Sequence, residues 1–183
     1  AEPLFRSITG LAAVPPLWAQ IANKTWPAEA QESLRYITNT AAALPPSHIE
    51  ELRAKFPHVT LYSMYGLTET KRTLYLPPDQ LDKRPGSVGI AIPGTEVWIE
   101  DDVGNRVGPG VVGELVIRGG HVMRGYWKLP EQDAAVFHVD EAGRRWYCTG
   151  DVVGRDADGN GCATVMSGDR RLGVVPNTVD KSL

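Results

Sequence analysis

Residues 59–70 read VTLYSMYGLTET. The first half, Val59 to Met64, is rich in aromatic and apolar residues and leads into a glycine-containing loop, which predicts a β-strand. A shorter run of the same kind, Leu34 to Thr38, predicts a second strand upstream. The loop at residues 65–70 combines a tyrosine, a glycine, two threonines and a glutamate.

A helix is expected between these two strands, from Ser47 to about Lys55. Ser47 and Glu50 have the spacing of a capping box, and Ile49 and Leu52 would lie on one face of the helix. The order of strand, helix and strand predicts a parallel α/β sheet, in which ligands bind beyond the carboxyl ends of the strands. The loop after the later strand is therefore a candidate site.

Another helix is expected near the start, over residues 11–22, because Pro15 and Pro16 are tolerated in a first turn. From Gly86 to about Asp151 the chain changes to short strands separated by glycine and proline turns. This pattern predicts an antiparallel sheet or small barrel. Strands are expected at residues 96–100, 113–118 and 146–149.

The predicted fold class is α/β, with a parallel-sheet α/β part followed by a small antiparallel β-sheet or barrel subdomain. We place the first part at residues 1–82 and the β-rich part at residues 83–159, because prolines bracket a charged segment between them. Residues 160–183 form a divergent tail.

The composition excludes several classes of protein. The 183 residues carry a net charge of −3 with scattered basic residues, which argues against a nucleic-acid surface. The two cysteines, Cys148 and Cys162, lack the spacing of a zinc site or a disulfide framework. The sequence shows neither a transmembrane run nor the pattern of a signal peptide. We therefore expect a soluble, cytoplasmic protein.

The loop from Tyr65 to Glu69 offers one group for each part of a nucleotide. The Tyr65 ring can stack on a base, and Gly66 permits close approach of the backbone. The Thr68 hydroxyl can donate to a phosphate oxygen, and Glu69 can hold Mg²⁺. By itself the stretch is also explained as an N-capped turn, in which Thr68 and Glu69 only begin a helix.

The stretch Tyr147-Cys148-Thr149-Gly150-Asp151 is a second candidate. An aspartate that follows a glycine at the end of a strand can accept hydrogen bonds from both hydroxyls of a ribose. The alternative is a simple β-turn aspartate.

Residues 113–130 contain a strand, a glycine-rich turn and two adjacent aromatic residues. We predict that most of this stretch is scaffold. Glu114 would orient neighbouring backbone, and the pair Tyr126 and Trp127 would belong to the core rather than to a cofactor stack.

Taken together, in this order and spacing, the three stretches resemble the AMP-forming acyl-CoA synthetases, whose superfamily also holds luciferases and peptide-synthetase adenylation domains. YGLTET is similar to the adenine and Mg²⁺ loop of that family, and YCTGD to its ribose-binding motif. GELVIRGGHVMRGYWKLPE is similar to its long central motif. The resemblance covers about residues 11–159.

The resemblance implies a role for each site residue. Tyr65 would stack on adenine, and Asp151 would hold the ribose hydroxyls. The two residues with catalytic roles are Thr68, which would contact the α-phosphate, and Glu69, which would ligate Mg²⁺. The rest of the adenine pocket would be backbone from Ala41, Ala42, Ala43 and Gly66.

The sequence departs from the family pattern in three places. Ala41 and Ala42 replace glycines, which adds methyl groups beside the base. We find no Ser/Thr/Gly-rich phosphate loop that ends in lysine. After Gly159 the expected Gly-Arg-x-Asp-Asp motif does not follow, and Lys181 has no motif around it. We therefore expect an internal piece of such an enzyme that is inactive alone.

The implied function is ATP-dependent, AMP-forming ligation of a carboxylic acid, of fatty or aryl type, to coenzyme A. ATP or AMP, Mg²⁺ and coenzyme A are the implied cofactors. Apolar segments around Trp18 and Met64 could wall an acyl pocket. Two alternatives stay open: a degenerate module without catalysis, and a peptide-synthetase-type domain that loads an acyl carrier protein. The stretch from Leu74 to Pro78 looks more like the acyl-CoA ligase branch.

Overall fold

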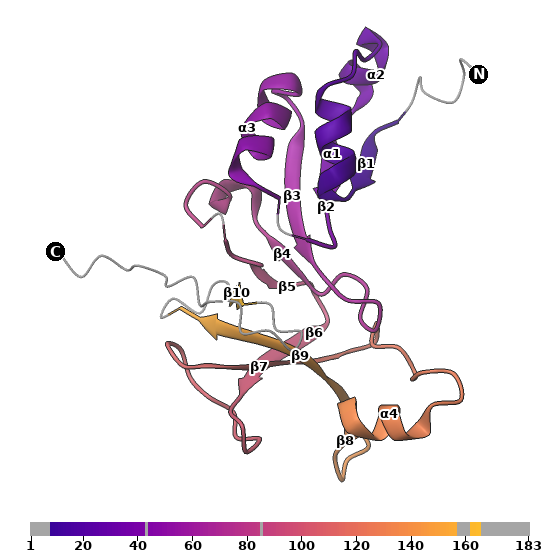
Figure 1. Ribbon diagram of the computed structural model, residues 1–183, viewed down its shortest axis with the longest axis vertical. Coiled ribbons are helices and arrows are strands. Elements are labelled where there is room, and N and C mark those ends of the chain that lie inside the picture. Colours follow the sequence, from indigo (N-terminus) through magenta and orange to yellow (C-terminus); the bar gives the residue numbers. More distant parts are fainter. Residues whose placement is uncertain (1–7, 43, 85, 157–161, 166–183) are drawn as a thin grey trace, which may run out of the picture.

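The structure is a computed structural model that describes residues 8–42, 44–84, 86–156 and the backbone of 162–165. Ala43, Lys181 and most of the predicted tail at residues 160–183 lie outside the described residues. The two sheets of the fold lie one beyond the other along the long axis of the molecule (Figure 1).

Sheet A is mixed, with strand order β1-β2-β3-β4-β5. β1 (Gly10–Ala13), β2 (Tyr36–Asn39) and β3 (Thr60–Tyr65) run parallel, which confirms the predicted parallel α/β part. β4 (Leu74–Leu76) and β5 (Ile90–Ala91) then add antiparallel strands at one edge.

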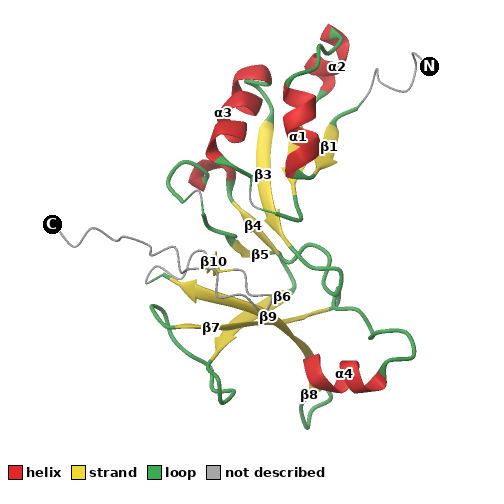
Figure 2. Cartoon of the chain, in the orientation of Figure 1, coloured by secondary structure: helices red, strands yellow, loops and turns green. Residues whose placement is uncertain are grey.

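Three helices accompany the parallel strands: α1 (Pro15–Ala22), α2 (Ala28–Ser33) and α3 (Pro46–Lys55). α1 and α3 pack over one apolar core of sheet A, and Figure 2 shows them on either side of β3 in this view. Between them lies a core of large apolar side chains that includes Trp18, Ile37, Leu52, Phe56 and Leu61.

The structure corrects two predicted helix starts. Residues 11–13 belong to strand β1 instead of the first helix, because they pair with β2 and because Pro15 and Pro16 fit only the first turn of a helix. α3 begins one residue before Ser47, with Pro45 at the N-cap and no side-chain cap bond, so the predicted capping box is wrong. The burial of Ile49 and Leu52 is confirmed.

A short 3₁₀ helix, η2 (Pro78–Gln80), lies between β4 and β5. An ion pair between Arg84 and Asp156 connects the segment between η2 and β5 to the end of β9 (Arg145–Arg155). The division of the chain at residues 82 and 83 stays a prediction, since β5 still pairs with sheet A while the following strands form a second sheet.

Sheet B is antiparallel, with strand order β10-β9-β7-β6, and it confirms the predicted β-rich part. β6 (Thr95–Glu100) and β7 (Val112–Gly119) match the expected strands, whereas β9 continues well beyond the predicted four residues. β8 (Phe137–Val139), β10 (Cys162–Val165) and helix α4 (Pro130–Val136) were not predicted.

One face of sheet B is apolar and meets the end of sheet A. Leu115, Ile117 and Val153 are fully buried there and pack with Leu74 of β4, while Tyr65 at the end of β3 packs against the same cluster. Burial of this kind contributes about 25 cal/mol per Å² of apolar surface. The cluster therefore fixes the end of β3 against sheet B.

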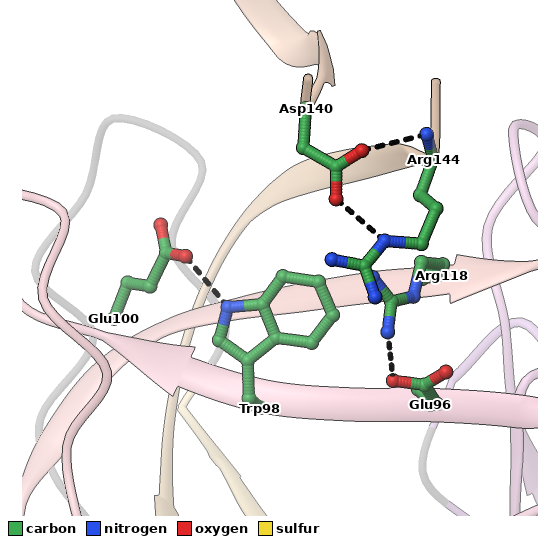
Figure 3. Close-up of polar contacts among 6 residues, drawn as sticks. All are labelled: Glu96, Trp98, Glu100, Arg118, Asp140 and Arg144. Atoms are coloured by element: carbon green, nitrogen blue, oxygen red, sulfur yellow. Dashed lines mark hydrogen bonds and ion pairs between the residues drawn. The ribbon is translucent and has the colours of Figure 1, made fainter. Parts of the chain in front are cut away.

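The opposite face of sheet B carries polar contacts around Trp98 (Figure 3), beside the fully buried Val116. The indole Nε1 donates to Glu100 at 2.6 Å, and the Arg106 guanidinium stacks 4.0 Å from the ring centroid. Figure 3 also shows an ion pair between Arg118 and Glu96 on neighbouring strands. This alternation of apolar and polar faces is typical of an antiparallel sheet with one solvated side.

Candidate functional site

The candidate loop begins where β3 ends, at Tyr65, and turns back sharply. A Cβ built on Gly66 would lie 1.5 Å from the main-chain oxygen of Lys71, so only glycine fits this position. Thr73 N donates to the Tyr65 oxygen at 2.9 Å, which brings the chain back into β4. Glycine is therefore required here by the loop's own backbone, and the predicted approach of Gly66 to a nucleotide stays a prediction.

Two buried threonines brace the inside of this loop. Thr73 Oγ1 donates to Thr70 Oγ1 at 2.9 Å, and Thr70 Oγ1 accepts from Leu67 N at 3.3 Å. Both threonines are completely buried. Thr68, in contrast, is exposed, so its hydroxyl is free of the loop's internal packing. Residues 68–70 form a turn, and no helix starts at Thr68 and Glu69, so the helix start considered as an alternative does not occur.

Asp151 lies on β9 beside the candidate loop. The Tyr65 hydroxyl donates to Asp151 Oδ2 at 2.5 Å, although 86 residues separate the two in sequence. Burial, and then the hydrogen bond to Asp151, raise the pKa of the Tyr65 hydroxyl well above its ordinary value. Burial also raises the pKa of Asp151, and the Tyr65 bond acts in the opposite direction.

The backbone around Asp151 is held by neighbouring strand β7. Glu114 Oε1 accepts from Gly150 N at 2.8 Å, as predicted for a carboxylate that orients backbone. Thr149 Oγ1 donates to the Leu115 oxygen at 2.8 Å and accepts from Asp151 N at 3.0 Å. Gly150 has a φ of 74°, a conformation that favours glycine.

The segment after β2, at residues 39–42, forms another part of the candidate site. Asn39 is 1% exposed, and its Nδ2 donates to the Ala42 oxygen at 2.8 Å. Ala41 adopts a φ of 72°, in the left-handed region where a methyl group is unfavourable. Ala41, at the position of the first of these glycines, therefore keeps a glycine-like backbone conformation. Ala43 lies outside the described residues.

A cavity of about 220 Å³ lies where these segments meet. Its lining includes Ala41, Ala42, Met64, Tyr65, Gly66 and Asp151. Five of the predicted nucleotide-contacting residues thus share one cavity. Of the two residues expected to wall an acyl pocket, Met64 lines this cavity, whereas Trp18 is buried in the core of sheet A.

Glu69 has a partner that was not expected. The Tyr126 hydroxyl donates to Glu69 Oε1 at 2.7 Å, and this bond raises the pKa of the Tyr126 hydroxyl. Tyr147 is 5% exposed, and the pKa of its hydroxyl is raised, first by burial and then by the negative charge of Glu69. The predicted core pair is therefore wrong: Tyr126 contacts the site, and Trp127 is 86% exposed because the turn before α4 directs it into solvent.

Within the described residues, no group of three or more His, Cys, Asp and Glu side chains is placed to hold a metal ion. Glu69 is thus a single carboxylate with one oxygen bonded to Tyr126. This arrangement fits Mg²⁺ bound with a nucleotide, because that ion takes one or two carboxylates and fills its other positions with water and phosphate. Separately, none of the helices in the described part of the chain has the length and apolarity to cross a bilayer.

Residues 6–127 match the family described as AMP-binding enzymes. The chain belongs to this family. Its members include ligases that activate different acids. Indoleacetate–CoA ligase of Aromatoleum aromaticum is 34% identical over 140 residues, which cover 76% of this chain and 26% of the relative.

Two further relatives of the chain differ from each other in the substrate and acceptor that their names give. A long-chain-fatty-acid–CoA ligase of Salmonella typhimurium is 40% identical over 95 residues, 52% of this chain and 16% of the relative. A D-alanine–D-alanyl carrier protein ligase of Lacticaseibacillus casei is 37% identical over 114 residues, 60% of this chain and 22% of the relative. The chain thus spans about a quarter or less of these curated relatives.

Solved structures of related enzymes share the fold. VinN superposes with a TM-score of 0.72 at 36% identity, over 87% of this chain and 39% of VinN. O-succinylbenzoate coenzyme A synthetase of Bacillus subtilis, solved in complex with AMP, gives a TM-score of 0.72 at 27% identity, over 87% of this chain and 31% of that enzyme. The predicted family and fold class are therefore confirmed.

Sequence reasoning missed Tyr126 and Asn39 as parts of the site. The signal for Tyr126 was its place in the stretch that resembles the central motif, but nothing local pairs it with Glu69, 57 residues away. Asn39 follows the predicted strand of residues 34–38 and stands two residues before Ala41, so its place beyond the carboxyl end of a strand was a usable signal.

Proposed function

We propose that this chain supplies the nucleoside-binding part of an ATP-dependent, AMP-forming ligase that activates a carboxylic acid as an acyl-adenylate. One observation carries the proposal: the adenine wall at Ala41 and Ala42, the aromatic ring of Tyr65 and the carboxylate of Asp151 line a single cavity. An aromatic ring and a backbone wall without large side chains suit adenine, and a carboxylate suits ribose.

In this proposal Tyr65 stacks on adenine, while Gly66 and the two alanines complete the base pocket. Asp151 accepts hydrogen bonds from the ribose hydroxyls, which requires it to be ionised. Burial alone favours the protonated acid, and the Tyr65 hydroxyl counteracts this by stabilising the carboxylate. Thr68 is exposed in the loop after β3, and in this proposal its hydroxyl donates to the α-phosphate.

The reaction that follows has two displacements. A carboxylate oxygen of the acid attacks the α-phosphorus of ATP, and pyrophosphate leaves. A thiol that has lost its proton to water then attacks the carbonyl carbon, and AMP leaves with the electron pair of the mixed anhydride bond. Mg²⁺ held by Glu69 would neutralise charge on the phosphates. The chain's own residues contribute by positioning the nucleotide for in-line attack.

We assign the acceptor thiol to coenzyme A and the acid to the fatty or aryl class. The support is that two relatives are CoA ligases, for indoleacetate and for long-chain fatty acids. The alternative acceptor is a carrier protein, which the D-alanyl carrier protein ligase favours. A cytoplasmic location is proposed with this activity, because the cysteines show no disulfide pattern.

AMP binding by calorimetry tests the nucleoside site. We expect weak binding that Asp151→Ala reduces at least about 10-fold, the value of one lost charge-assisted hydrogen bond. Asp102→Ala, in the exposed turn after β6, is the matched control and should change nothing. Binding that Asp151→Ala leaves intact would show that the ribose assignment is wrong.

A pyrophosphate-release assay distinguishes the nucleoside site from complete catalysis. The 183-residue chain contains no phosphate loop ending in lysine and no motif around Lys181. We therefore expect no acyl-adenylate formation from ATP and a fatty or aryl acid. Measurable turnover would contradict this expectation and exclude the non-catalytic module as the description of this chain.

A further inference from the structure

The segment from Gly119 to Trp127 contacts the candidate loop and the residues directly after it at three points. Tyr126 Oη donates to Glu69 Oε1 at 2.7 Å, and Met123 N donates to the Glu69 main-chain oxygen at 2.8 Å. His121 Nε2 lies 3.4 Å from Thr73 Oγ1, which in turn bonds Thr70. Both the main chain and the side chain of Glu69 are therefore held from one segment.

Tyr126 is itself rigidly placed. Its backbone N donates to Asp133 Oδ1 of α4 at 2.7 Å, and its ring lies 6.0 Å from that of Phe137. Gly125 makes this possible: its φ is 150°, and an added Cβ would lie 2.1 Å from Asp133 Oδ2. The hydroxyl of Tyr126 therefore points at Glu69 before any ligand arrives.

The second anchor, Met123, is fixed in the same way. The Arg145 guanidinium donates to the Met123 oxygen at 2.5 Å and lies 3.9 Å from the Phe137 ring centroid. Phe137 in turn packs against Tyr147, with ring centroids 5.0 Å apart. The contacts that hold Glu69 therefore continue through Arg145 to the buried side chains of Phe137 in β8 and Tyr147 in β9.

We propose that Tyr126 is a positioning residue for the divalent cation that accompanies the nucleotide phosphates. By holding Glu69 Oε1, it fixes the carboxylate in one orientation and leaves Oε2 for the cation. This inference rests on the proposed function. Outer partners of a metal ligand typically change metal affinity 10- to 100-fold when they are removed.

A purely structural role for Tyr126 gives a different expectation. If the hydroxyl only stabilised the fold, its loss would weaken AMP binding in the absence of metal as much as ATP binding in its presence. The cation role predicts a loss confined to the Mg²⁺-dependent part of ATP affinity. The two readouts can be measured on the same variant.

The experiment measures ATP affinity in excess Mg²⁺ and in EDTA, and AMP affinity in EDTA, for the 183-residue chain. We expect Tyr126→Phe to reduce the Mg²⁺-dependent gain in ATP affinity about 10-fold and to leave AMP affinity in EDTA unchanged. Glu69→Gln should abolish the gain, and the double variant should lose no more. Tyr62→Phe, on sheet A, is the matched control.

Each outcome separates the inference from the proposed function. A full Mg²⁺ gain in Tyr126→Phe, or an equal loss of AMP affinity in EDTA, would overturn the positioning role. AMP binding to the unmodified chain without any Mg²⁺ gain for ATP would overturn it as well, while the nucleoside site would stand. Failure of the unmodified chain to bind AMP in EDTA would instead refute the proposed function.

Discussion

The hydroxyl of Tyr65 donates a 2.5 Å hydrogen bond to Oδ2 of Asp151, and both residues line the same cavity. The end of a parallel strand in sheet A is thereby joined to the longest strand of sheet B. The bond occupies one of the two oxygens that a ribose would use. In the proposed function, the remaining acceptor positions of Asp151 would take the ribose hydroxyls, while the Tyr65 bond keeps the carboxylate ionised.

Replacing Tyr65 with phenylalanine should change how stability depends on pH. The folded pKa of the Tyr65 hydroxyl lies above the unfolded value of about 10, so its stabilising contribution is complete below about pH 10 and is lost as pH rises further. The loss amounts to about 1.4 kcal/mol per pH unit. Urea denaturation at pH 9, 10 and 11 should show a shallower decline for Tyr65→Phe than for the unmodified chain.

The same alkaline region includes Tyr147, whose pKa is also raised, chiefly by burial. Some decline should therefore persist in Tyr65→Phe and diminish further in the double variant with Tyr147→Phe. Identical slopes for the unmodified chain and Tyr65→Phe would mean that the Tyr65 hydroxyl ionises equally well in the folded and unfolded states.

Ala41→Gly should stabilise the protein, by up to about 1 kcal/mol. The left-handed φ of 72° costs alanine about 1–2 kcal/mol, of which the greater freedom of unfolded glycine cancels a part. Ala42→Gly is the matched control, because Ala42 has no positive φ, and it should destabilise by about 0.5–1 kcal/mol. Unfolding free energies of both variants decide the matter; equal destabilisation would contradict the strain at Ala41.

Gly66→Ala should be severely destabilising, by about 3 kcal/mol or more, because the new methyl group would collide with the main-chain oxygen of Lys71. AMP binding should be lost together with the turn. Gly108→Ala, where an added Cβ meets nothing within 4 Å, should be nearly neutral. Thermal melting compares the two, and similar melting temperatures would show that the loop opens without cost.

Cys148 should react slowly with alkylating reagents. Burial, followed by the charges of Glu114 and Glu100, raises the pKa of its thiol to about 11. At pH 8 it therefore carries about 100-fold less thiolate than an ordinary cysteine. Iodoacetamide labelling followed by peptide mass spectrometry gives the rate against pH.

Glu100→Gln is the informative variant for this test, since it removes one negative charge and keeps a group that can accept from Trp98. Its Cys148 should be alkylated faster at pH 8 than in the unmodified chain. Rapid labelling of the unmodified chain at pH 8 would show that the thiol is not protected.

The sequence alone determined those features that depend on neighbouring residues. The strand over residues 60–65 and the face of α3 with Ile49 and Leu52 follow from local apolar patterns. The order of the three motifs was enough to identify the family, now confirmed by the match over residues 6–127. The orienting role of Glu114 was also predicted, because a carboxylate within a folded sheet needs hydrogen-bond donors, and backbone N–H groups can provide them.

Only the tertiary structure decided which distant groups meet. The bond between Tyr65 and Asp151 spans 86 residues, and that between Tyr126 and Glu69 spans 57. Both depend on sheet B packing its apolar face against the end of sheet A. Local patterns also could not show that Tyr126 faces the loop while Trp127 faces solvent, because burial depends on what the rest of the chain places beside a residue.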